Sequence, residues 1–125
     1  MAEQIEALAA FVASTPPPDI PIQVRHQAKH VLLDTIGVVL AGSLRPEVTS
    51  ARARLCAGGS ADGATVFSAG PVRTDPRTAA LLNGMAGRAI ELCEGLRFAS
   101  GQVAVQVLPS VLAVAEAVTP PGRRS

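Results

Sequence analysis

Two stretches rich in Ala, Leu and Val enclose a polar loop between residues 79 and 117, and this arrangement limits what the chain can fold into. Asp75 and Pro76 are typical of a helix start, because a side-chain acceptor precedes a residue whose missing N–H costs nothing in a first turn. We predict that a second helix opens at Pro109, since the residue before a proline favours extended backbone. Two helices therefore present one loop that is rich in charge.

The segments before residue 75 contain three further helical patterns. Apolar residues at 5, 8, 9 and 12 predict an amphipathic helix over 2–13, and similar arguments predict helices over 21–41 and 45–55. Residues 64–67 are expected to form a short extended segment that packs on the helices without belonging to a sheet. The sequence thus predicts an all-α fold, a helical bundle of about five helices with one short extended segment.

Charge and aromatic content exclude nucleic acid as a partner. Eleven basic and ten acidic side chains give a net charge of +1 and are mixed along the chain, so there is no basic stripe for phosphates. The chain has three Phe and neither Tyr nor Trp, which leaves little for stacking on bases.

The hydrophobic fraction is high for a small domain, at 48%. No apolar run reaches the roughly 20 residues that a bilayer crossing needs, and the N-terminal segment is acidic rather than leader-like. We therefore expect a cytoplasmic protein with no membrane association. The excess of apolar side chains is most simply explained by a partner chain that covers them.

Metal and redox chemistry have weak support in the sequence. His26, His30 and Asp34 follow one another at intervals of four residues, but such a row leans around a helix and more often faces solvent or a partner than a metal ion. Cys56 and Cys93 lie far apart, which is typical of packed cysteines rather than of a zinc or redox motif. The sequence implies no metal and no organic cofactor.

Several segments in fixed order carry a family resemblance. They are Asp19–Pro21, Ala28–Ser43, Ala64–Ser68, Asn83-Gly84, Arg88–Leu92, Arg97–Gly101, Val107–Pro109 and Leu112–Glu116. In these segments the chain resembles the N-terminal helical domain of the MmgE/PrpD family, to which 2-methylcitrate dehydratase, cis-aconitate decarboxylase and iminodisuccinate epimerase belong. Family members are several times longer, so the resemblance implies a partial helical domain over residues 1–118, followed by a frayed tail over 119–125.

The resemblance also implies where chemistry would take place. Glu91 occupies a position where the family has an active-site carboxylate, and it is the expected catalytic residue. The expected substrate-binding residues surround it in the loop: Arg88, Glu94, Arg97, Ser100 and Gln102. Each also has a plainer interpretation, because Arg88 with Glu91 and Glu94 with Arg97 have the spacing of ordinary helix-surface ion pairs.

The chain departs from the family pattern at positions that matter for proton transfer. Cys93 replaces a residue that is usually acidic, Gln102 and Val103 replace an expected His-Pro pair, and Gln106 is often histidine in relatives. Glutamine forms hydrogen bonds but does not titrate near neutral pH, so the imidazole acid/base role is missing from this chain.

Three hypotheses follow. The first is the small subunit of a split enzyme, in which a larger MmgE/PrpD-like chain completes the active site and the assembly dimerises further. Its chemistry would be lyase-type elimination, or a related cyclising displacement, on a small carboxylate-bearing metabolite, in secondary metabolism. The second is a non-catalytic binding or regulatory subunit that stabilises a larger relative. The third, a truncated fragment, ranks last.

Overall fold

A computed structural model describes residues 2–59, 63–95 and 101–119, in two compact units, residues 1–30 and 31–125. The first unit contains α1 (Ala2–Ser14), a 3-10 turn (Pro17–Asp19) and the first part of α2 (Ile22–Gly42). The predicted amphipathic helix α1 forms, but its apolar side chains are exposed: Ile5, Leu8, Phe11 and Val12 are each 63–69% accessible. This unit therefore presents an apolar helix face.

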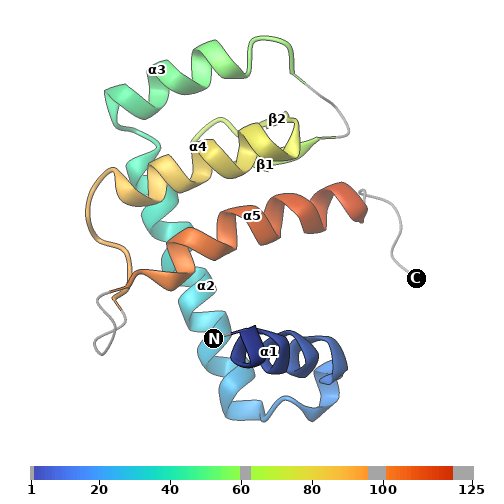
Figure 1. Cartoon of the computed structure of the whole chain (residues 1–125). Coiled ribbons are helices and arrows are strands. Elements are labelled where there is room, and N and C mark those ends of the chain that lie inside the picture. Colours follow the sequence, from blue (N-terminus) through green and yellow to red (C-terminus); the bar gives the residue numbers. More distant parts are fainter. Residues whose placement is uncertain (1, 60–62, 96–100, 120–125) are drawn as a thin grey trace. The chain divides into compact units, whose positions relative to one another are not determined.

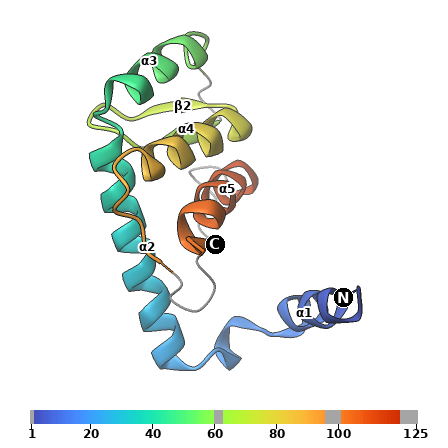
Figure 2. The same ribbon diagram turned by 60° about the vertical axis from the view of Figure 1, so that its left-hand side comes forward.

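The second unit is built around α4 (Pro76–Arg88). α3 (Pro46–Leu55) and α5 (Val103–Val118) each contact α4, which lies between them in both Figure 1 and Figure 2. Strands β1 (Ala64–Val66) and β2 (Val72–Thr74) complete the unit. Among the described residues five α-helices and one small sheet are present, so the all-α prediction is confirmed.

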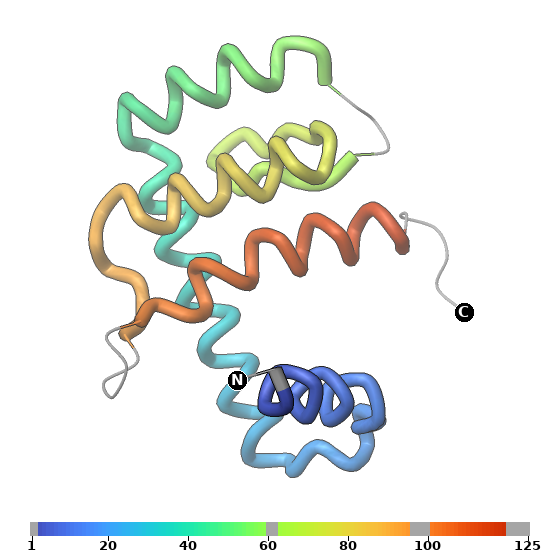
Figure 3. The backbone as a smooth tube through the Cα atoms, in the orientation of Figure 1, coloured from blue at the N-terminus to red at the C-terminus, as the bar shows by residue number. Residues whose placement is uncertain are grey.

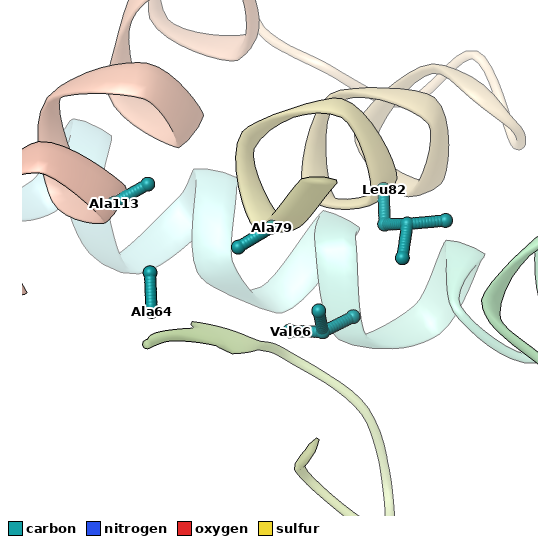
Figure 4. Packing of buried hydrophobic residues seen from close by; sticks show 5 residues of the cluster. All are labelled: Ala64, Val66, Ala79, Leu82 and Ala113. Atoms are coloured by element: carbon teal, nitrogen blue, oxygen red, sulfur yellow. The ribbon is translucent and has the colours of Figure 1, made fainter. Parts of the chain in front are cut away.

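Small side chains form the core of the second unit. Figure 4 shows Ala64 and Val66 of β1 with Ala79 and Leu82 of α4 and Ala113 of α5, all of which are at most 4% exposed. Three of these five residues are alanines, so the backbones of α4, α5 and β1 approach one another closely. A second cluster joins Val39 of α2 and Val48 of α3 to Ala86 of α4.

Two glycines permit close backbone approach near the end of α4. A Cβ added at Gly42, the last residue of α2, would overlap the carbonyl oxygen of Ala86. A Cβ added at Gly87 would overlap the side chain of Val105 in α5. Helix α2 therefore ends where glycine was predicted to stop it, and that glycine also serves the packing against α4.

The extended segment at residues 64–67 does belong to a sheet, so that detail of the prediction is wrong. β1 pairs with β2 in antiparallel register, with Thr65 opposite Arg73. The second strand has only three residues, one of them an exposed valine. So short a segment shows too little alternation of apolar and polar residues to be predicted as a strand. The predicted packing of the segment on the helices is confirmed, since β1 contacts both α4 and α5.

Side chains from both flanking helices satisfy the backbone of β1. Asn83 of α4 is 2% exposed; its Nδ2 donates to the carbonyl oxygen of Thr65 at 2.9 Å, and its Oδ1 accepts from the N–H of Phe67 at 2.9 Å. Glu116 of α5 accepts from both the N–H and the hydroxyl of Thr65, each at 2.8 Å. The side chains of Asn83 and Glu116 thus form the hydrogen bonds that a third strand would otherwise make with the backbone of this segment.

Helix α5 begins at Val103, six residues before the predicted start. Pro109 lies inside the helix and is buried, although an interior proline removes one hydrogen bond and crowds the preceding turn. Ala104 and Val105 of the first turn are also buried. Packing of this extra turn outweighs the local preference of the Leu108-Pro109 pair for extended backbone.

Candidate functional site

The site is positioned by α4, whose two ends have different polar groups. At its start the carboxylate of Asp75 accepts from the N–H groups of Arg77 and Thr78, each at 3.1 Å, which confirms the predicted helix start. Hydrogen bonds from Thr78, and then from Arg77, lower the pKa of Asp75. The cap therefore makes its full contribution to stability when the pH is above 3.8, the ordinary pKa of an Asp side chain. That contribution is lost as the pH falls through the lower pKa that Asp75 has in the folded chain.

At its other end α4 stops at Arg88, earlier than expected. The helix-surface spacing of Arg88 with Glu91 and of Glu94 with Arg97 would require the helix to continue, but Ala89 donates back to Ala86 in a tightened last turn and Glu91 adopts a φ of +54°. This left-handed conformation is unfavourable for a residue with a Cβ and cannot continue a helix. Figure 3 shows that the coloured tube leaves the helical path directly after α4. Glu91, Cys93 and Glu94 thus lie on a loop.

Arg88 gathers two loop residues around its guanidinium. Nη2 donates to both carboxylate oxygens of Glu91, each at 2.9 Å, and Nη1 donates to Sγ of Cys93 at 3.0 Å. The Arg88 side chain is 40% exposed and that of Glu91 is 69% exposed. Of the predicted site residues, the structure therefore brings Arg88 and Glu91 together and adds Cys93, for which the sequence favoured the interpretation of a packed thiol.

The guanidinium of Arg88 is the anion-binding group of this cluster, and Glu91 occupies it in the structure. The hydrogen bond to Cys93, and then the charge of Glu91, raise the pKa of Arg88, so the guanidinium stays charged at every physiological pH. A guanidinium binds carboxylates through charge-assisted hydrogen bonds, and Glu91 shows that a carboxylate fits at this position. The arrangement can hold a carboxylate beside a thiol and a second carboxylate.

Glu94 has a structural role that the sequence did not indicate. Its Oε1 accepts from the backbone N–H of Ala104, in the first turn of α5. Gln102 precedes that turn at the capping position, is half-buried, and makes no capping hydrogen bond with its own side chain. The carboxylate of Glu94, ten residues earlier in the sequence, thus caps α5. Its negative charge also interacts favourably with the positive end of the helix dipole.

Two predicted substrate-binding residues, Arg97 and Ser100, lie outside the described residues. Gln102 is described, but among the described residues no hydrogen bond or ion pair joins it to Arg88 or Glu91. The described residues of the predicted site therefore lie in two places: Arg88 and Glu91 pair with each other beside Cys93, whereas Glu94 and Gln102 lie at the start of α5.

The histidine row of the first unit does not form a metal site with its neighbours. His26 and His30 line an open hollow on α2 together with Ile22, Gln23 and Gln27. Across residues 2–59, 63–95 and 101–119, no three His, Cys, Asp or Glu side chains are grouped to hold a metal ion. Over the same residues, none of the helices combines the length and apolarity of a membrane span.

Comparison with known proteins agrees with the resemblance seen in the sequence. No curated protein and no solved structure matches the chain significantly. The family model of the MmgE/PrpD N-terminal domain, however, matches residues 6–125. This match covers α4, the Arg88–Glu91–Cys93 cluster and α5, and the mostly helical fold is consistent with it. The chain therefore belongs to the MmgE/PrpD family.

Proposed function

We propose that this chain is the small subunit of a split, heteromeric MmgE/PrpD-like enzyme, with a larger MmgE/PrpD-like chain as its partner. The reaction we propose is a lyase-type elimination, or a related cyclising displacement, on a small carboxylate-bearing metabolite, without a metal or organic cofactor. We place the assembly in the cytoplasm and in secondary metabolism, and expect it to dimerise further.

The exposed face of α5 is the observation that carries this proposal. The helix buries Ala104, Val105, Pro109 and Ala113 against its own unit, yet the opposite side is also apolar. Five valines along that side are 48–73% exposed, namely Val103, Val107, Val111, Val114 and Val118. Apart from the exposed Gln106 and Ser110, α5 is apolar on both sides. This pattern is typical of a buried helix, and we infer that a further protein surface covers α5.

The spacing of these valines favours a helix as the covering element. Positions 107, 111, 114 and 118 follow intervals of four, three and four residues, which is the seam along which two helices pack. Glu116 is the only charged residue of α5, and its carboxylate is engaged by Thr65 within the unit. An uncharged helix from the partner fits this seam without burying an unpaired charge.

The Arg88 cluster supports the chemistry. Arg88 would hold a substrate carboxylate by charge-assisted hydrogen bonds, and Glu91 would accept the proton adjacent to a substrate carbonyl. The partner chain would supply the proton to the leaving group, because Gln102 and Gln106 cannot do so.

A specific observation favours the alternative of a non-catalytic binding or regulatory subunit. The guanidinium of Arg88 is already engaged by Glu91 and Cys93 of its own chain. A cluster closed in this way, with amides where the family has imidazoles, also suits a subunit that stabilises a larger relative.

Activity of the assembled complex separates the two functions. In the complex with the larger chain, Glu91→Gln is expected to lower kcat for the preferred substrate by about 100-fold or more, because loss of a general base typically costs this much. The assay measures turnover of 2-methylcitrate, cis-aconitate and related polycarboxylates, with the exposed Arg77→Gln variant as the control. Unchanged turnover in Glu91→Gln would favour the non-catalytic subunit.

A further inference from the structure

The pairing of Arg88 with Glu91 is accompanied by an unfavourable backbone conformation at Glu91. Glu91 is the only described residue other than glycine with a positive φ, at +54°. This conformation directs its carboxylate back to the last residue of α4, where both oxygens accept from one nitrogen of Arg88 at 2.9 Å. The loop thus holds Glu91 in an unfavourable conformation while the carboxylate occupies Arg88.

We propose that Glu91 is an internal stand-in for a ligand carboxylate, and that a small carboxylate binds Arg88 beside Cys93 by displacing it. This inference rests on the proposed function only for its assumption that the cluster is a substrate site. The ligand class is a mono- or dicarboxylic acid, because the occupied position accepts one planar carboxylate and leaves the thiol beside it.

The exposure of the pair makes such an exchange feasible. The Glu91 side chain is 69% exposed, and an exposed ion pair contributes little net stability. A competing carboxylate can therefore replace Glu91 at a small cost in free energy. Glu91 nevertheless competes as part of the same chain, with an effective concentration of about millimolar for a short flexible tether. Free carboxylates should therefore bind the unmodified chain weakly, and removal of Glu91 should strengthen their binding.

The exchange would also couple binding to catalysis. Once a ligand carboxylate takes its place on Arg88, the Glu91 carboxylate is released from its two hydrogen bonds beside the ligand, where it can serve as the proposed base. Glu91 would thus be free to act only when the substrate is present.

Cys93 provides a direct probe, because its Sγ lies 3.0 Å from Nη1 of Arg88. Iodoacetate carries a carboxylate that Arg88 can bind, whereas iodoacetamide is neutral, and both alkylate a thiolate with loss of iodide. The experiment measures both alkylation rates at Cys93 in the full chain by peptide mass spectrometry. Cys56, which packs beside the core of the same molecule, is the internal control.

We expect Glu91→Gly to raise the iodoacetate-to-iodoacetamide rate ratio at Cys93 by about tenfold, because the charge of Arg88 then concentrates the anionic reagent. Glycine suits the positive φ, and Glu91→Gln serves as a second variant that retains side-chain size. Added succinate should reverse the increase, and Arg88→Gln combined with Glu91→Gly should abolish it.

An unchanged ratio at Cys93 in both Glu91 variants would overturn the inference, as would an equal increase at Cys56 or an increase that persists without Arg88. The measurement needs no partner chain. Its failure would therefore leave the proposed heteromeric enzyme standing, and loss of the heteromer would leave this result intact.

Discussion

In the complex that we propose with a larger MmgE/PrpD-like chain, Val111→Lys in α5 is expected to weaken binding by at least about 100-fold, because burying an unpaired ammonium costs several kcal/mol. Val111 is 52% exposed in the chain itself. Together with Val107, Val114 and Val118 it forms the row of exposed valines on α5 that we call the valine seam. Lysine also has a higher helix propensity than valine, so the isolated subunit should tolerate the change. The loss would therefore arise at the interface.

Titration calorimetry or biolayer interferometry measures this effect on the dissociation constant. The matched control is Ser50→Lys, which adds the same charge at an exposed position of α3. We expect the control to change the dissociation constant by less than about threefold, since rim and remote surface positions contribute little. Equal affinity of Val111→Lys and the original chain would show that the partner does not cover the valine seam.

Asn83→Ala is expected to lower the free energy of unfolding by about 2–4 kcal/mol, because it leaves two buried backbone groups without partners. These groups are the carbonyl oxygen of Thr65 and the N–H of Phe67, which Asn83 binds at 2.9 Å each. The loss should detach β1 from α4 and expose the alanine-rich core beneath it.

Urea unfolding followed by far-ultraviolet circular dichroism gives this free energy, and urea also limits association through exposed apolar faces. Arg77→Ala, at an exposed position of the same helix, is the control and should change the stability by no more than about 0.5 kcal/mol. A loss below about 1 kcal/mol in Asn83→Ala would contradict the role assigned to this side chain.

The role of Asn83 illustrates what the sequence could not supply. In the sequence Asn83 stands out only as part of the Asn83-Gly84 pair that carries the family resemblance, because no local pattern specifies hydrogen bonds to a segment 16–18 residues away. The start of α4 was predictable because the Asp75 cap and Pro76 act within one turn. Local rules thus placed the start of α4, whereas the long-range hydrogen bonds of Asn83 could not be predicted from the sequence.

The same distinction explains the errors around the site. Proline chemistry predicted a start of α5 at Pro109, but burial of Ala104 and Val105 extends the helix backwards to Val103. The spacing of Arg88 and Glu91 did predict their ion pair, although as a pair on a helix surface. The left-handed backbone at Glu91 and the hydrogen bond from Arg88 to Cys93 carry no signal in the sequence, because both depend on the path of the loop.

The mass of the chain in solution tests the central claim most directly. Multi-angle light scattering after size-exclusion chromatography would compare the chain alone with the chain co-expressed with the product of the neighbouring open reading frame, which we propose to be the larger MmgE/PrpD-like protein. We expect polydisperse association of the chain alone, driven by its exposed valines and leucines, and one discrete heteromer with defined stoichiometry on co-expression. A monodisperse, cooperatively folding chain that does not bind the larger protein would contradict the account and would indicate an independent binding domain.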